Sequence, residues 1–163
     1  MDLSNKLLSY KQIDVNAGDK YGKTPLMIAC KNRSLEVVKK LLAMGANPNT
    51  KRSFGFTALH ESTLVGDIDI ATILVENGAD ANAMALMDIT PLHNAASFGS
   101  VKLLEILVEK GGADVNAKTL KGQTALDICT SLGYTDCIEY LAPKTTVSAA
   151  PAPAPSTETN EEN

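Results

Sequence analysis

The residues best suited to chemistry in this 163-residue chain are two histidines and three cysteines: His60, His93, Cys30, Cys129 and Cys137. A nucleophilic cysteine needs a histidine beside it as a base and a third group that orients the pair. Each cysteine is instead remote in sequence from both histidines, and the cysteine spacings match no metal site. The chain also has no GxGxxG, Walker-type or HExxH motif. The sequence therefore predicts a protein that is not an enzyme and that has no metal site and no cofactor.

The overall composition narrows the function classes and the compartment. A net charge of −4 and a pI near 5.1 argue against general nucleic-acid binding. The apolar runs are too short to span a membrane, and the opening MDLSNKLLSY lacks the features of a secretory signal. Three cysteines cannot all pair with one another, which favours free thiols in a reducing compartment. We therefore expect a cytoplasmic or nuclear protein with no nucleic-acid or membrane partner.

The two histidines occupy equivalent positions of an internal repeat. Four threonines begin the same short motif at spacings of 33, 33 and 34 residues: Thr24, Thr57, Thr90 and Thr124. Eight residues before each threonine stands an asparagine: Asn16, Asn49, Asn82 and Asn116. Seventeen residues after each threonine stands a leucine: Leu41, Leu74, Leu107 and Leu141. The doubled glycine at 111 and 112 accounts for the one longer spacing, and the fixed period indicates a repeat protein.

Each repeat has the pattern of a short helix, a turn, a second helix and an extended loop. The motif threonine can cap the first helix, and the proline that follows it in two copies loses no hydrogen bond there. A small residue recurs where a neighbouring helix must approach closely: Ala29, Ser62, Ala95 and Cys129. Glycines are expected to end the first helix (66, 99 and 133) and the second (45, 78 and 111). One unit alone cannot bury its apolar face, so the core must come from stacking.

Residues 14–142 resemble four ankyrin repeats, because a Thr-Pro-Leu-His motif, helix-ending glycines and a Gly-Ala-Asp loop recur in register. The repeats lie near residues 14–46, 47–79, 80–113 and 114–142. The resemblance implies an all-α repeat solenoid of stacked helix-turn-helix units with β-hairpin fingers. It also implies that the motif histidines bond neighbouring loops and that the motif asparagines stabilise the hairpin turns. The cysteines, for their part, are expected to be small buried side chains.

The two ends of the chain depart from this pattern. Residues 1–13 fit the second helix of a unit that lacks its first, and we interpret them as a partial N-terminal cap. Their large apolar residues include Leu3, Leu7, Leu8 and Ile13. The repeat domain is then expected to cover residues 1–142. Residues 143–163 are rich in alanine and proline and end in acidic residues, which predicts a disordered tail.

In ankyrin repeat proteins the fingers and the concave face of the inner helices usually hold the partner. At these positions the two middle repeats carry nine large apolar residues, and all three phenylalanines of the chain are among them. With one tyrosine of the first repeat, the apolar candidates are Tyr21, Phe54, Phe56, Leu64, Val65, Met84, Leu86, Met87, Ile89 and Phe98. The basic candidates at the rim are Lys51, Arg52, Lys118 and Lys121. The alternative for some of these side chains is burial against a neighbouring finger.

These features predict a non-catalytic module for protein–protein interaction. Exposed apolar residues would anchor the partner, and the basic rim would steer it. The partner is expected to be another protein that offers an amphipathic or acidic segment, and the free chain is expected to be a monomer. The alternative functions are a stoichiometric inhibitor or regulator of an enzyme or transcription complex, or one part of a larger scaffold.

Overall fold

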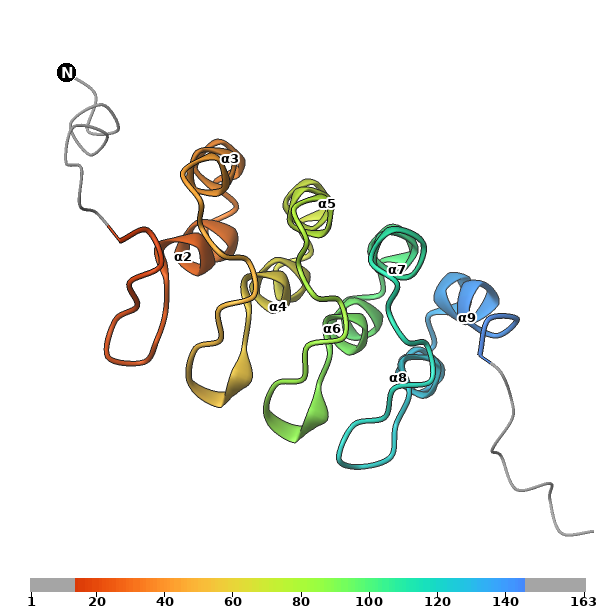
Figure 1. Cartoon of the computed structure of the whole chain (residues 1–163). Helices are drawn as coiled ribbons and strands as arrows, with labels where there is room; N and C mark the ends of the chain where they lie inside the picture. Colours follow the sequence, from red (N-terminus) through yellow and green to blue (C-terminus); the bar gives the residue numbers. More distant parts are fainter. Residues whose placement is uncertain (1–13, 146–163) are drawn as a thin grey trace, which may run out of the picture.

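The computed structural model describes residues 14–145 and arranges them as a stack of four helix pairs (Figure 1). The inner helices are α2 (Pro25–Lys31), α4 (Ala58–Leu64), α6 (Pro91–Phe98) and α8 (Ala125–Leu132). The outer helices are α3 (Leu35–Ala43), α5 (Ile68–Glu76), α7 (Val101–Glu105) and α9 (Thr135–Leu141). Figure 1 shows the two rows as separate layers, with one loop projecting beside each inner helix. The predicted all-α solenoid is therefore confirmed.

The predictions for the two chain ends fall largely outside the structure. The predicted cap, residues 1–13, and residues 146–163 of the predicted tail lie outside the described residues.

Each inner helix begins at its motif threonine, as predicted. The hydroxyl of Thr24 accepts a hydrogen bond from the backbone N–H of Met27 at 3.4 Å. In the later repeats the threonine forms a capping box with the residue three positions on, which is His60, His93 or Asp127. Such caps satisfy backbone N–H groups that the first helical turn leaves unpaired. The repeated threonine thus fixes where each stacking unit begins.

Small and branched aliphatic side chains build the core between the layers. The small-residue register is buried in every repeat, with Ala29 5% exposed and Ser62, Ala95 and Cys129 fully buried. All three cysteines are free and buried, and burial raises the pKa of Cys30 and Cys129 to about 12. A thiol with so high a pKa carries almost no thiolate at neutral pH, so the prediction of buried structural cysteines is confirmed.

The loops beside the inner helices, here called the fingers, hold little β-structure. They comprise residues 17–23 (finger 1), 50–56 (finger 2), 83–89 (finger 3) and 117–123 (finger 4). The described residues contain one isolated bridge, between Ala85 and Ile89, and no longer strand. The predicted β-hairpins are thus tight turns closed by few backbone hydrogen bonds, such as those in finger 2 from Arg52 N to Phe56 O and from Gly55 N to Arg52 O, both at 2.9 Å.

The motif asparagines join successive repeats, as the resemblance implied. Asn49 Nδ2 donates to the Gly78 carbonyl at 2.9 Å, and its Oδ1 accepts from Asp80 N at 2.7 Å. Asn82 makes the same two contacts with Gly112 and Asp114. Each loop is therefore held in register by the loop of the next repeat.

The one inserted residue of the chain is absorbed by an outer helix. After α7 the chain forms a π-helical turn over Ile106–Lys110, which Gly111 ends. Gly111 N donates to Ile106 O at 3.1 Å, which closes the wider turn. Gly112 then adopts the left-handed conformation, with φ of +63°, that Gly78 adopts in the preceding repeat. The extra residue therefore does not displace the finger that follows.

Candidate protein-interaction site

The two histidines anchor each middle inner helix to the finger of the next repeat. His60 Nδ1 accepts from the backbone N–H of Thr57 at 3.2 Å, and Nε2 lies 3.0 Å from the Ile89 carbonyl. Because a carbonyl only accepts, Nε2 carries the proton and the ring is neutral. His93 repeats the arrangement, with Nδ1 3.1 Å from Thr90 N and Nε2 3.0 Å from the Ala117 carbonyl. The predicted structural role of both histidines is confirmed.

Acid should destabilise the fold through these two rings. Burial lowers the pKa of His60 and of His93 below the ordinary 6.5, because desolvation disfavours the charged ring. As the pH falls, the two histidines of the unfolded chain therefore bind protons before those of the folded chain do. Their contribution to the free energy of unfolding is complete above about pH 6.5 and declines as the pH falls toward the folded pKa values. We expect the midpoint of urea unfolding to fall between pH 7 and pH 5. The same decline in a His60→Gln/His93→Gln variant would contradict this assignment.

The tips of fingers 2 and 3 expose large apolar side chains. Phe54 is 66% exposed and Met87 is 40% exposed, and Met84 and Leu86 are exposed beside them. Tyr21 is exposed at the tip of finger 1. The backbone joins some of these tips, since Ser53 N donates to Tyr21 O at 2.7 Å and Leu120 N donates to Met87 O at 2.8 Å. The fingers therefore present their apolar side chains along one edge of the stack.

Two of these apolar residues have a backbone conformation that disfavours their side chains. Phe54 and Met87 both have φ of +66°, whereas in fingers 1 and 4 only glycines have positive φ. Left-handed geometry costs a residue with a Cβ about 1–2 kcal/mol. An exposed side chain recovers little of this cost through packing. Since strained residues gather at functional sites, Phe54 and Met87 are the strongest candidates for a role outside the fold.

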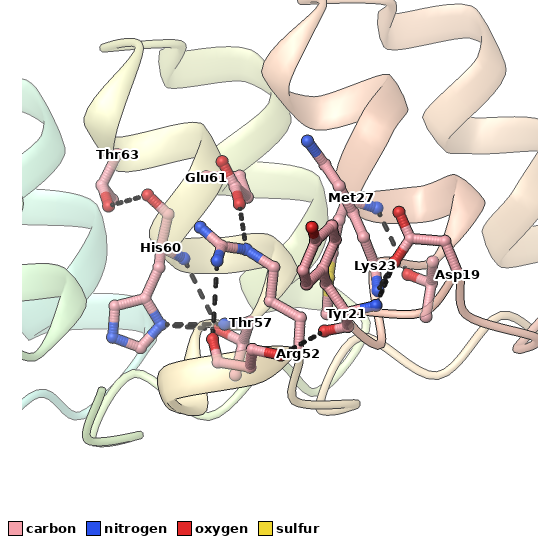
Figure 2. A network of polar contacts seen from close by, with 11 residues as sticks. Asp19, Tyr21, Lys23, Met27, Arg52, Thr57, His60, Glu61 and Thr63 are labelled. Carbon is pink, nitrogen blue, oxygen red and sulfur yellow. Dashed lines mark hydrogen bonds and ion pairs between the residues drawn. The ribbon is translucent and has the colours of Figure 1, made fainter. Parts of the chain in front are cut away.

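Arg52 and Phe56 are instead engaged inside the protein, and Figure 2 shows Arg52 directed toward Glu61. Arg52 Nε lies 2.8 Å from Glu61 Oε1, and its guanidinium lies 4.5 Å from the centre of the Phe56 ring. The Phe56 ring meets His60 edge to face at 5.5 Å. Both residues are half-buried, in contrast to the expectation that they face a partner. Their physical role is to close the base of finger 2 over α4.

A second apolar row lies where the inner helices end. Leu64 and Phe98 are exposed there, as expected. The Phe98 ring lies so close over Gly66 that a Cβ at that glycine would collide with it. Val65 is half-buried, and its carbonyl accepts a hydrogen bond from the Arg33 guanidinium. Ile89 is likewise half-buried, and its carbonyl accepts from His60, so both offer less surface than expected.

The fingers are basic on a protein that is acidic overall. Their basic residues are Lys20, Lys23, Lys51, Arg52, Lys118 and Lys121, and their acidic residues are Asp19 and Asp88, against a net charge of −4. Lys51, Lys118 and Lys121 are exposed. Arg52 differs from them, because the buried carboxylate of Glu61 neutralises it. The exposed lysines therefore leave the fingers with a net positive charge.

The site residues predicted from sequence leave out two residues that matter here, Leu120 on the surface and Glu61 beneath it, although Leu120 lies at a finger position expected to face a partner. Leu120, on finger 4, is 69% exposed and occupies the register of Leu86, so its register alone could have identified it. Glu61 is buried at a register where the first and last repeats carry isoleucine, Ile28 and Ile128. A glutamate at that register, together with an arginine in finger 2, was the sequence signal that could have predicted the ion pair between Glu61 and Arg52.

The part of the chain that the structure describes holds no group of three or more residues able to bind a metal ion. Among the same residues, no helix is long and apolar enough to cross a membrane.

Comparison with known proteins agrees with this architecture. A family model of ankyrin repeats in three copies matches residues 2–85 and 83–149. The ANK repeat-containing protein nipk-1 of Caenorhabditis elegans is 43% identical over 53 residues. These residues make up 31% of this chain and 9% of that protein, so the chain spans a small fraction of its relative.

Proposed function

The chain belongs to the ankyrin repeat family, whose members are generally non-catalytic protein-interaction modules, and on this basis we propose that it binds another protein through fingers 2 and 3. The adjoining ends of α4 and α6 extend this surface. The partner contributes a segment with both apolar and acidic side chains.

One observation carries this proposal: exposed Phe54 and Met87 hold left-handed backbone positions that suit glycine or asparagine better. Neither side chain is required by the stack, since its counterparts in fingers 1 and 4 are Tyr21 and Lys121. Large apolar and aromatic side chains commonly dominate binding energy when a partner buries them. A binding role accounts for residues that the fold alone would disfavour.

The lysines of the fingers should steer the partner. We expect Lys118→Glu/Lys121→Glu to slow association with a partner captured from the source organism about tenfold at low salt, because the charges act during encounter. The difference should shrink as salt is added, since screening shortens the range of these charges. Stopped-flow or surface-based kinetics at several salt concentrations would measure it.

A matched control for this experiment lies on the outer helices. Lys39→Glu/Lys102→Glu makes the same change of charge at exposed positions of α3 and α7. This control should associate at nearly the wild-type rate. Equal slowing by both double variants would assign the effect to net charge and refute the basic fingers as the steering surface.

A further inference from the structure

Neighbouring fingers touch through their backbones, and the contact repeats from one finger to the next. A Cβ added at Gly22 would lie 3.2 Å from Arg52 Cα, and one added at Gly55 would lie 3.2 Å from Ala85 Cα. Both pairs join the same two registers of successive repeats. Fingers 1, 2 and 3 therefore follow one another with the same close step, and Figure 1 shows all four fingers projecting in one row.

This step sets the distance between the two strongest candidate anchors. Each finger is a turn of two chain segments, and hydrogen-bonded neighbouring segments lie about 4.8 Å apart. Phe54 and Met87 occupy the same register of fingers 2 and 3, so about 10 Å separates them along the row. The inner helices under the fingers agree with this distance, since packed helices have axes about 8–10 Å apart.

The spacing of the anchors suits an α-helix better than an extended strand. A helix rises about 1.5 Å per residue, so two turns, or about seven residues, cover the distance and return the side chains to one face. A strand covers it in about three residues, and side chains three positions apart point to opposite faces. A straight helix can therefore offer an apolar side chain to Phe54 and to Met87 at once, whereas a straight strand can offer one to only one of them.

Exposed lysines stand on both sides of the apolar tip of finger 3. Lys51 precedes it on finger 2, and Lys118 and Lys121 follow it on finger 4. The sequence of fingers 2 to 4 contains one acidic residue, Asp88. Carboxylates on either side of a partner's apolar stripe would meet these lysines, while a basic segment would be repelled.

We infer that the segment bound by fingers 2 and 3 is an amphipathic α-helix that lies along the row of finger tips and carries acidic residues beside its apolar stripe. The inference rests on the proposed function, because it describes the segment that these fingers bind. Apolar residues seven positions apart in this helix contact Phe54 and Met87. Fingers 2 to 4 span about 20 Å, so a helix of about 14 residues is long enough to reach the lysines of both outer fingers.

Two synthetic peptides of identical composition test the inference with the full chain. One places leucines on a single helical face among glutamates and alanines, and the other reorders the same residues so that its leucines fall at every second position, the period of a strand. In fluorescence anisotropy the helix-patterned peptide should bind about tenfold more tightly or better, because it alone reaches both anchors. Equal or tighter binding of the strand-patterned peptide, or no binding of the helix-patterned one, would overturn the inference.

A charge-reversed peptide tests the acidic part of the inference. It keeps the leucines of the helix-patterned peptide and has lysine in place of each glutamate. It should bind about tenfold more weakly than the acidic peptide at low salt, because the exposed lysines of the fingers repel it. Equal binding of the two peptides would refute the acidic helix as the occupant.

Variants of the chain separate this inference from the proposed function. Phe54→Asn/Met87→Asn should weaken binding of the helix-patterned peptide about tenfold or more. Ile68→Thr, at a position of α5 that is 37% exposed, is the control and should not change it. A preference for the strand pattern that the double variant abolishes would refute the helix and leave the fingers as the site. Tight binding of the helix-patterned peptide that the double variant leaves unchanged would refute the fingers themselves.

Double-mutant cycles between peptide and protein test the register. Each leucine of the helix-patterned peptide is replaced by alanine in turn and measured against Phe54→Asn and Met87→Asn separately. The leucine coupled to Phe54 should lie about seven residues from the leucine coupled to Met87. Coupling of both protein positions to one leucine, or to leucines on different helical faces, would contradict a helix that lies along the row.

Discussion

Replacing Phe54 and Met87 together by asparagine should weaken partner binding about 100-fold or more, while Tm stays unchanged or rises slightly. Each anchor that a partner buries contributes on the order of 1–3 kcal/mol, and 1.4 kcal/mol corresponds to a factor of ten in affinity. Asparagine tolerates the left-handed conformation of both positions better than phenylalanine or methionine does. The substitutions should therefore remove binding surface without removing packing that the fold needs.

This combination of effects separates a binding residue from a structural residue. Titration calorimetry with the captured partner would give the affinity, and thermal unfolding would give Tm. Ile68→Thr serves as the control, because it removes an exposed apolar side chain from α5 in favour of the residue that α9 has at that register, Thr135. It should leave affinity unchanged. Wild-type affinity in the asparagine double variant, or a large drop in its Tm, would contradict the account.

Arg52→Ala should lower the free energy of unfolding by about 3 kcal/mol, although the residue lies in a surface finger. The side chains of Arg52 and Glu61 are only 23% and 6% exposed, and their ion pair is 2.8 Å long. Removing the arginine leaves the Glu61 carboxylate buried without its countercharge, which is costly. It also removes the guanidinium from the Phe56 ring, a smaller loss.

The double substitution Arg52→Met/Glu61→Met should restore most of that stability. Apolar residues of similar volume often replace a buried ion pair at little cost, so we expect the double variant within about 1 kcal/mol of wild type. Urea unfolding of the wild type, Arg52→Met, Glu61→Met and the double variant completes a double-mutant cycle. If Arg52→Ala unfolds at the wild-type urea concentration, the pair contributes nothing to stability and Arg52 is free to contact a partner.

The repeat framework was predictable because its physical causes are local and recur four times. A threonine cap, a small residue at the helix contact and a glycine at the helix end act within a few residues of themselves. Repetition reveals them even in a single sequence. The roles of the motif histidines and asparagines are not local, since these side chains bond the next repeat; the resemblance to ankyrin repeats implied them.

The details of the fingers were not predictable in this way. Phe56 and Phe54 stand two residues apart in one finger, yet only Phe54 is strongly exposed. Phe56 is less exposed because Arg52, which is paired with Glu61, lies over its ring. Phe54 and Met87 also have positive φ, although residues with a Cβ prefer negative φ. Sequence rules that assume negative φ at such residues cannot predict this conformation. The π-helical turn at Ile106–Lys110 depends on how a helix absorbs one residue under tertiary packing.

Hydrogen exchange of the full chain, alone and with its captured partner, tests the central proposal most directly. The measurement compares the protection of backbone amides in the fingers with that in the outer helices. Binding should slow exchange most at residues 50–56 and 83–89, with a smaller effect at the ends of α4 and α6. New protection confined to the outer helices α3, α5, α7 and α9 would show that the partner binds the opposite layer and would contradict the proposal.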